Sequence, residues 1–346
     1  MQTVELKNIC EVFSNVIKNN SIRPITDLVQ IMGREMIMTD GITTICANLS
    51  EEIKGKCVIS LSKLFSITKL TTTDEIELKI HKDYVSFKGN GNYKIPINVD
   101  YGGEEINLST NISFNFSFAQ KFSIDKIKEI YGRSKIAISD INEELSAFYF
   151  INNGMVATDS VIVAFNKCDN FIVDNIQPHV LEKLSYLKTD VEMGLEDNKI
   201  LVKSDIFTLS IINDKANFPI DSVKPFISPL DSQTLFCNSF KIQKKDLLMP
   251  IKRQNVFKSI FNPPSVYIDI LSNKVHITNK NNTSDEELLY SELANDDAAV
   301  HVIVSTERLM GILKVMDEEI KIYLGCEAMA LEDSKGVYIL GCMEEK

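Results

Sequence analysis

Apolar residues recur along this chain with two different periods, and the two periods alternate in a fixed order. Three stretches place apolar residues three or four positions apart, which is the spacing of an amphipathic helix that packs one face on a core. These stretches are 5–20, 123–139 and 241–258. We therefore expect a helix to open each third of the chain.

Pro250 stands inside the third of these helical patterns. A proline in a helix interior lacks the N–H for one backbone hydrogen bond and costs ~3 kcal/mol. We therefore expect either a kink at this point or a helix that begins at Pro250.

A second kind of segment passes from a short apolar strand through a polar residue into a shorter helix. VISLSKLFSI (58–67) and IVSTERLMGI (303–312) align without gaps, so that Ser60 matches Ser305 and Lys63 matches Arg308. A small polar residue before a helical pattern is a typical N-cap. NIQPHVLEKL keeps the apolar positions of this segment in the middle of the chain. The expected helices are 60–70, 177–189 and 305–316.

Strict alternation of apolar and polar residues follows each of these shorter helices. Such alternation, interrupted by Gly, Asn and Asp, is typical of antiparallel hairpins. The alternating stretches are 75–97, 191–212 and 319–342. We interpret KGNGNYK (88–94) as one of the hairpin turns, because a phosphate-binding loop would need a following helix and a Lys-Ser/Thr pair.

One sequence motif, which we call the Thr-Asp phrase, occurs twice in nearly the same form. MIMTDGITTICA (36–47) and MVATDSVIVAFN (155–166) each break an apolar run with Thr-Asp and a small residue. Together with the recurring helices and hairpins, at offsets of about 115–117 and 245 residues, this predicts three copies of one unit. We expect an α+β fold with sheets and helices in layers. The predicted domains are 1–112, 113–230 and 231–346.

The net charge of −11 hides a segregation of charge along the chain. The six expected helices hold 18 Lys+Arg and 7 Asp+Glu, a net of +11, so the other 259 residues carry −22. Basic residues are good helix formers on solvated faces, which is one explanation. Glu forms helices equally well but is displaced to strands and loops. A surface that attracts a polyanion, beside an exterior that repels it, explains both observations.

The chain resembles the DNA polymerase sliding clamp family, in its bacterial and phage three-domain beta-clamp type. The resemblance is carried by the two Thr-Asp phrases, by VISLSKLFSI and IVSTERLMGI, and by the hairpins that follow them. NFPIDSVKP (217–225) resembles the family's linker between the second and third domains. The resemblance covers essentially the whole chain.

The resemblance implies six similar domains in a closed ring, which two chains form by meeting head to tail. Basic helices would line the hole and antiparallel sheets would form the outer wall, so that DNA phosphates are bound without reading the bases. The implied channel residues are Lys63, Lys69, Lys126, Lys128, Arg133, Lys135, Lys183, Lys188, Lys244, Lys245, Lys252, Arg253, Lys258, Arg308 and Lys314. The implied ring interface is Leu64, Phe257, Ile260 and Phe261.

The resemblance also implies an apolar pocket between the second and third domains, where polymerases and clamp loaders insert a short peptide. The matching residues are Leu145, Thr158, Ser160, Val161, Pro219, Val223, Ala328, Ile339, Leu340 and Met343. The family's His-Arg after its Thr-Asp-Gly phrase is Val161-Ile162 here, and its apolar, proline-containing tail is replaced by GCMEEK. We therefore expect a pocket adapted to a different peptide. Ordinary core packing is the other interpretation of these residues.

Catalytic and metal-binding patterns are absent from the sequence. It contains no GxSxG, no HExxH and no cysteine–histidine signature, and its four histidines are isolated. We interpret the acidic run Asp285-Glu286-Glu287 as a solvated loop and expect no metal or cofactor. No apolar run approaches the 18 residues typical of a membrane span.

The leading hypothesis is a cytoplasmic homodimeric sliding clamp that encircles duplex DNA and tethers the replicative polymerase, with a clamp loader as a further partner. An alternative is a clamp-fold scaffold that recruits transcription or repair proteins to DNA without supporting synthesis. An unrecognised hydrolase is a third hypothesis, although we expect the protein not to be an enzyme.

Overall fold

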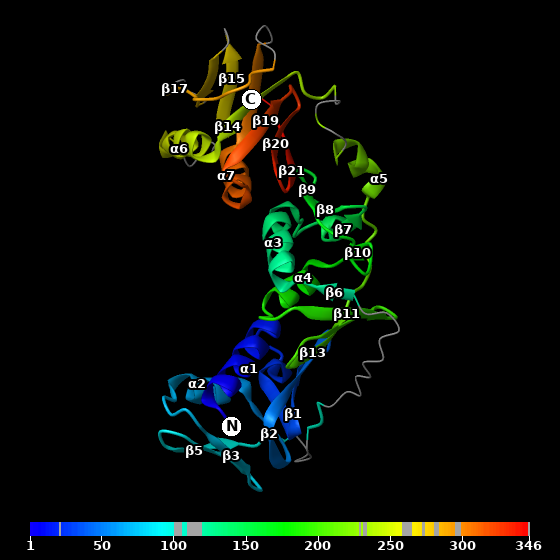
Figure 1. Ribbon diagram of the computed structural model, residues 1–346, viewed down its shortest axis with the longest axis vertical. Coiled ribbons are helices and arrows are strands. Elements are labelled where there is room, and N and C mark those ends of the chain that lie inside the picture. Colours follow the sequence, from blue (N-terminus) through cyan, green and yellow to red (C-terminus); the bar gives the residue numbers. More distant parts are fainter. Residues whose placement is uncertain are drawn as a thin grey trace. The chain divides into compact units, whose positions relative to one another are not determined.

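The computed structural model forms two compact units (Figure 1), which are described separately. Unit 1 comprises Met1–Lys128 and His179–Asp214, and unit 2 comprises Glu129–Pro178 and Lys215–Lys346. The residues that the structure describes are 1–20, 22–99, 106–108, 120–227, 230, 234–257, 265–271, 274–279, 284–294 and 299–344. Lys258, Ile260 and Phe261, named above as candidate site residues, lie outside these ranges, as does the side chain of Phe257.

Unit 1 contains a six-stranded and a three-stranded antiparallel sheet. The strand order of the larger sheet is β1-β2-β13-β12-β11-β6. Its strands are β1 (Leu28–Thr39), β2 (Thr43–Ser60), β6 (Gln120–Phe122), β11 (Val191–Glu196), β12 (Lys199–Lys203) and β13 (Phe207–Ile212). The smaller sheet has β3 (Glu77–Ile80), β4 (Tyr84–Lys88) and β5 (Asn92–Pro96) in sequence order. The helices are α1 (Thr3–Val16), α2 (Leu61–Leu70) and α4 (Pro178–Ser185), the last with its first residue in unit 2.

Unit 2 contains an eight-stranded and a four-stranded antiparallel sheet. The orders are β10-β7-β8-β9-β21-β20-β19-β14 and β17-β16-β15-β18. The larger sheet comprises β7 (Phe148–Ile151), β8 (Gly154–Thr158), β9 (Ile162–Lys167), β10 (Asn175–Ile176), β14 (Asn238–Gln243), β19 (Glu319–Leu324), β20 (Ala328–Asp333) and β21 (Gly336–Gly341). The smaller sheet comprises β15 (Ser265–Leu271), β16 (Lys274–Thr278), β17 (Asp285–Glu287) and β18 (Val300–Ser305).

The helices of unit 2 are α5 (Ile220–Val223), α6 (Lys244–Gln254) and α7 (Thr306–Val315), while α3 (Ile124–Ser134) begins in unit 1 and ends in unit 2. Short 3-10 helices are Pro24–Asp27, Lys135–Ala137, Glu143–Leu145, Lys224–Ile227 and Asn255–Phe257. The six predicted helices are therefore confirmed as α1, α2, α3, α4, α6 and α7. Pro250 lies inside α6, so the expectation that this helix begins there is wrong.

The amphipathic pattern that predicted α1 corresponds to its buried face. Leu6, Ile9 and Phe13 are almost fully buried, and the Phe13 ring lies 6.4 Å from that of Phe207 on β13. Burying each side chain of this size contributes about 1.5–3 kcal/mol relative to leaving it in water. The helix is thus held on the sheet by the residues that its period of 3.6 places on one side.

The predicted N-caps occupy matching positions in two of the copies. Ser60 accepts the backbone N–H of Lys63 at the start of α2, and Ser305 accepts that of Arg308 at the start of α7. Each cap satisfies one of the N–H groups that a helix start leaves without a partner. The cap therefore fixes where the third residue of each helix lies.

Each large sheet joins strands from two consecutive copies of the repeat. In unit 1, β2 of the first copy pairs with β13 of the second, from Ala47 opposite Phe207 to Thr43 opposite Ile211. In unit 2, β9 of the second copy pairs with β21 of the third in the same antiparallel manner. The strands β3–β5 of the first copy and β15–β18 of the third form the two smaller sheets.

Candidate functional site

The first Thr-Asp phrase forms a tight turn between β1 and β2. Oδ1 of Asp40 accepts the backbone N–H groups of Ile42 and Thr43 at 2.9 and 2.6 Å. Oγ1 of Thr39 accepts the N–H of Gly41 at 3.1 Å. Gly41 has a φ of 88°, in the left-handed region where glycine is favoured. The two polar side chains therefore satisfy the backbone groups that the turn removes from the ladder.

The second phrase forms the same turn between β8 and β9. Oδ1 of Asp159 accepts the N–H groups of Val161 and Ile162 at 2.9 and 2.7 Å, and Oγ1 of Thr158 accepts that of Ser160 at 3.1 Å. Ser160 has a φ of 76°, a left-handed conformation that is uncommon for a residue with a side chain. The backbone hydrogen bonds that the side chains of Thr158 and Asp159 accept stabilise this conformation.

The second carboxylate oxygen of each Asp binds a basic residue of the next copy. Oδ2 of Asp40 lies 3.0 Å from Nζ of Lys183 on α4, and Oδ2 of Asp159 is paired with Nη1 of Arg308 on α7. The Asp159 side chain is only 12% exposed, so solvent screens this ion pair less than it would a surface pair. In the third copy Thr278 again ends a strand, β16, but Asn279 follows it in place of Asp.

Several predicted channel residues are exposed lysines on the helices or directly after them. Lys63 and Lys69 lie on α2, Lys126 and Lys128 on α3, and Lys314 on α7. Among the predicted channel residues that the structure describes, those that are exposed and make no ion pair with another described residue are Lys63, Lys69, Lys128, Lys135, Lys245, Lys252 and Lys314. All three copies contribute to this set, which we call the free lysines.

Other predicted channel residues are engaged with carboxylates. Lys188 pairs with Glu11 at 2.7 Å, Lys244 with Glu318 at 3.1 Å, and Arg253 with Glu286 on β17. Lys183 and Arg308 bind the two turn carboxylates described above. A carboxylate partner competes with DNA phosphate for these side chains, so they are less available than the free lysines.

Arg133 does not lie on an exposed helix face, and the prediction that it does is wrong. It is 4% exposed, and its Nη2 donates to both carboxylate oxygens of Asp333, at 2.8 and 2.9 Å. Its Nε donates to Asn166 and its Nη1 to the carbonyl of Val315, each at 2.8 Å. The guanidinium therefore joins α3 to three other segments of unit 2 and has no free donor edge for DNA.

Asp333, which ends β20 within the predicted hairpin stretch 319–342, was not identified from the sequence. Its carboxylate also accepts the backbone N–H groups of Asp317, Lys335 and Gly336, each at 2.9 Å. A buried carboxylate with this many donors is fully satisfied, as a buried charge must be to avoid a large desolvation cost.

The predicted peptide-pocket residues all belong to unit 2, and most of them lie in or beside two neighbouring apolar clusters and the β8–β9 turn. Ala328 and Ile339 pack with Tyr323 and Leu230. Val223, one turn after Pro219, packs with Phe218 and Val156. The half-buried Val163 on β9 packs against both clusters. The linker residues around α5 thus cover the β7–β9 part of the sheet.

The β8–β9 turn lies beside the end of β21. Leu340 is opposite Ile162, and the N–H of Gly341 donates to the carbonyl of Val161 at 2.9 Å. Val161 is 40% exposed and presents an apolar side chain to solvent at this point. The structure thus brings Ser160 and Val161 to the end of the last strand.

The remaining predicted pocket residues lie elsewhere in unit 2. Leu145 is buried on the 3-10 helix Glu143–Leu145, and the N–H of Met343 donates to the carbonyl of Ile303 on β18 at 2.8 Å. The backbone after β21 is therefore bound to the smaller sheet of unit 2.

Leu64, predicted to lie in the ring interface, is fully buried on α2 within its own chain. A side chain without exposed surface offers no contact to a second chain, so this part of the prediction is wrong. Leu70, at the end of the same helix, is 80% exposed.

The acidic run Asp285–Glu287 is an edge strand, β17, and the prediction of a solvated loop is wrong. Its three carboxylates pair with His276, Arg253 and Lys274 respectively. The alternating pattern was too short to predict a strand, because three residues fix no period.

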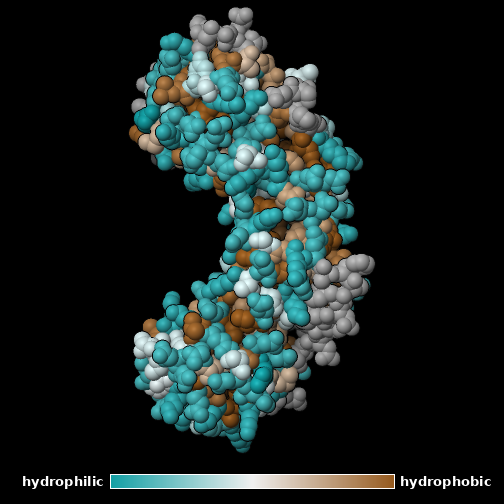
Figure 2. Space-filling view, in the orientation of Figure 1, coloured by the Kyte–Doolittle hydropathy of each residue, from teal (hydrophilic) through white to brown (hydrophobic). Residues whose placement is uncertain are grey.

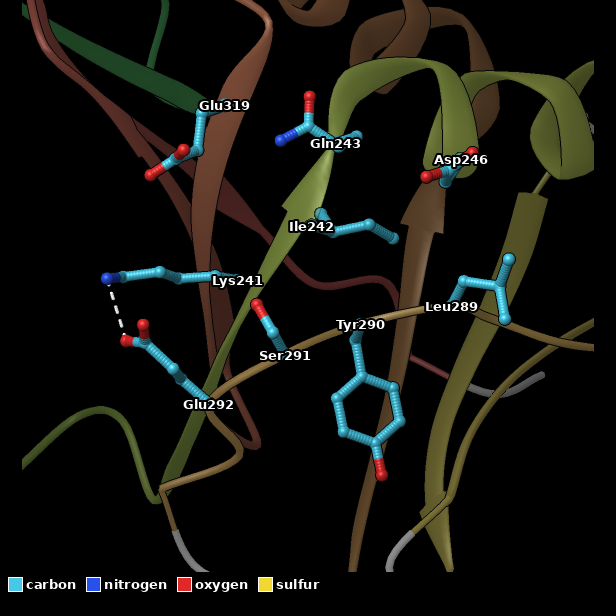
Figure 3. A pocket seen from close by; sticks show the side chains of 9 residues that line it. All are labelled: Lys241, Ile242, Gln243, Asp246, Leu289, Tyr290, Ser291, Glu292 and Glu319. Atoms are coloured by element: carbon cyan, nitrogen blue, oxygen red, sulfur yellow. Dashed lines mark ion pairs between the residues drawn. The ribbon is translucent and has the colours of Figure 1, made fainter.

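A cavity of about 330 Å³ opens beside β14, and none of the site residues predicted from sequence is among those that line it. Figure 3 shows its wall, where the Lys241 side chain reaches the Glu292 carboxylate at 2.7 Å. Glu319 and Asp246 add two further carboxylates. Its polar lining differs from the mostly apolar lining of typical small-molecule sites.

The face shown in Figure 2 is mostly hydrophilic, with apolar residues scattered in small areas. Among the described residues no cluster of His, Cys, Asp and Glu is arranged to hold a metal ion. In the same part of the chain, no helix combines the length and hydrophobicity that crossing a membrane requires.

No family model matches the chain, and neither does any curated protein. Solved structures do match it over its full length. The DNA polymerase III beta subunit of Thermotoga maritima is 15% identical with a TM-score of 0.80, covering 100% of this chain and 99% of its own. The DNA polymerase sliding clamp of Bacillus subtilis is 15% identical with a TM-score of 0.83, covering 100% and 98%.

The DNA polymerase III beta chain of Streptococcus pneumoniae gives a TM-score of 0.81 at 15% identity, with 99% and 98% of the two chains covered. The chain therefore has the fold of the bacterial DNA polymerase III beta sliding clamps from end to end, and the resemblance stated from its sequence is confirmed at the level of fold. Identities this low leave the function to be inferred from the residues of this chain.

Proposed function

We propose that this protein is a DNA sliding clamp: two chains form a ring around duplex DNA and tether a replicative polymerase to it. The observation that carries the proposal is the pairing of strands across copies. Each large sheet is completed by strands of the next copy, whereas among the described residues no strand of another copy pairs with β15–β18 of the third copy or β3–β5 of the first.

A second chain would supply neighbouring strands for both smaller sheets at once. If β15–β18 of one chain meet β3–β5 of another as consecutive copies meet within a chain, the contact is head to tail and recurs twice. Two chains of three domains, divided near 112 and 230, then close by rotation into six similar domains.

Among the described strands, the outer strands β17 and β5 of the two smaller sheets differ in the sign of their charged residues, which supports this arrangement. By its place after two hairpin strands, β17 corresponds to β9, and it consists of three carboxylic residues. β5 corresponds to β13 and β21 and carries the exposed Lys94. The strands that pair within the chain have no charged residue in the segments 43–47 and 336–340. Opposite charges on free edges favour the intended partner and disfavour pairing of like edges.

The free lysines are the proposed DNA contacts. They come from all three copies, and each would neutralise phosphate without reading bases, as sliding requires. Arg133 is excluded from this set because its guanidinium is buried against Asp333.

The β8–β9 turn, the end of β21 and the linker around Pro219 form the proposed docking site for a polymerase or clamp-loader peptide. Val161 supplies exposed apolar surface there, and the neighbouring clusters include Val223 and Ile339. Apolar anchors in a partner peptide are the complement of such a surface. We further propose that the protein acts on cytoplasmic DNA and performs no catalysis of its own.

Primer extension on a singly primed circular template, with the replicative polymerase of the same genome, tests the proposal. The expected result is a marked increase in product length per binding event once the protein and its loader are present. Recruitment of transcription or repair proteins without longer products would instead favour the scaffold alternative.

A further inference from the structure

The Asp159 carboxylate connects two elements of unit 2 that are remote in sequence. One oxygen holds the β8–β9 turn through two backbone N–H groups, and the other binds Arg308 on α7. The same residue that shapes the turn therefore fixes it to the helix. The Asp159 carboxylate therefore determines both the conformation of the turn and its position relative to α7.

The β8–β9 turn contains a residue with a side chain in the left-handed backbone conformation. Within the described part of the proposed docking site, no other non-glycine residue adopts it. Ser160 has a φ of 76°, and Val161 next to it is tied by its carbonyl to Gly341 at the end of β21. A conformation of this kind persists only where its surroundings hold it. Moving the Asp159 carboxylate would therefore shift the two residues that face a bound peptide.

Burial makes the pair a stronger anchor than an exposed ion pair. The Asp159 side chain is 12% exposed and that of Arg308 is 36% exposed, so the carboxylate is largely withdrawn from water. Removing its cationic partner would leave a mostly buried charge without compensation, which costs more than losing a surface pair.

We propose that Asp159 and Arg308 are positioning residues of the peptide-docking site, and that Arg308 serves this site in place of binding DNA phosphate. The inference rests on the docking site proposed above. It assigns Arg308 to the partner-binding side of the protein, contrary to the channel role that the sequence suggested, because its Nη1 is already bound to Asp159.

The chain contains its own control for this inference. Asp40 holds the β1–β2 turn in the same way and binds Lys183 at 3.0 Å, but this turn lies in unit 1 and contributes no residue to the proposed docking site. The pair also shows that lysine can serve as the cation in this arrangement.

The experiment measures binding of the full chain to the immobilised replicative polymerase of the same genome by biolayer interferometry. Asp159→Asn keeps an oxygen that can accept the turn N–H groups but removes the charge, and Arg308→Gln removes the cation. Each is expected to weaken binding about threefold to tenfold, and the double variant no further, because both remove one interaction. Arg308→Lys is expected to restore most of the affinity.

Asp40→Asn is the matched control and is expected to leave the affinity within about twofold. Urea unfolding of every variant separates positioning from general destabilisation, and amide hydrogen exchange at 160–162 reports the turn directly. Unchanged affinity in Asp159→Asn, or an equal loss in Asp40→Asn, would overturn the inference and leave the proposed function standing. Failure of the unaltered protein to bind the polymerase would overturn the docking site and this inference together.

Discussion

Nη2 of Arg133 on α3 donates to both carboxylate oxygens of Asp333, 200 residues later in the chain, in an ion pair that is almost entirely buried. The two residues belong to the second and third copies of the repeat. Both are also bound to other groups: Arg133 to Asn166 and Val315, and Asp333 to three backbone N–H groups. The pair therefore lies at the centre of a polar network that links these copies.

Asp333→Ala is predicted to destabilise the protein by about 3–5 kcal/mol, because it leaves a buried guanidinium without its counter-charge. Equilibrium urea unfolding measures the change. Asp205→Ala, at an exposed position between β12 and β13, is the matched control and should change stability by less than about 0.5 kcal/mol. A change in Asp333→Ala no larger than in the control would contradict the role assigned to this pair.

Reversing the charge of exposed helix lysines is predicted to shorten the products of primer extension. Lys63→Glu, Lys128→Glu and Lys252→Glu together place negative charge where we propose phosphate contacts, so DNA binding should fall while folding is retained. The control with the same change of charge is Lys199→Glu, Lys203→Glu and Lys215→Glu, at exposed positions off the helices. If the two triple variants shortened the products equally, net charge alone would determine the product length, and the helix lysines would not be specific DNA contacts.

Self-association is predicted to depend on Lys94 and on salt. Lys94→Glu places a negative charge on β5, which we propose faces the acidic β17 of a second chain, so the dimer should dissociate about threefold to tenfold more readily. Sedimentation equilibrium at several chain concentrations measures this. Lys203→Glu should have no effect, and added salt should weaken the unaltered dimer. A dimer as tight in Lys94→Glu as in the unaltered protein would exclude this edge.

His179 is predicted to make stability fall as pH drops below its unfolded-state pKa of about 6.5. Burial lowers its pKa below the ordinary value, while its Nε2 lies 2.9 Å from the carbonyl of Ile212. As pH falls through the unfolded-state pKa of about 6.5, the unfolded chain takes up a proton that the folded chain does not. The stability that neutral His179 contributes is therefore present above that pH and is lost as pH falls toward its folded pKa.

Urea midpoints at closely spaced pH values measure this contribution. His179→Gln retains a side-chain N–H for Ile212 but does not titrate, so its stability should vary less with pH than that of the unaltered protein. The same slope in both proteins would show that other groups cause the dependence.

Much of the fold could be predicted from the sequence because its signals are periodic and recur. The helix around Leu6 and Phe13 and the N-caps Ser60 and Ser305 follow from local patterns, and repetition in three copies distinguishes them from chance. The strand β17 could not be predicted, since three acidic residues carry no alternation and only the neighbouring strand defines them as an edge.

The candidate site was harder to predict because it depends on which charges meet after folding. Sequence spacing places Arg133 and Lys128 on one helix but does not reveal that Asp333 buries the first of them. Arg308 was likewise predicted to be a channel residue, because its position on a helix does not reveal that Asp159 pairs with it. The recurrence of Thr-Asp and of a basic helix was visible in the sequence, but their pairing as Asp40–Lys183 and Asp159–Arg308 requires the three-dimensional structure.

Negative-stain electron microscopy of the purified protein at high concentration shows directly whether two chains close into a ring. We expect closed rings of two chains, each with a hole wide enough for duplex DNA. Particles without a hole, with sedimentation showing single chains at the same concentration, would contradict this expectation.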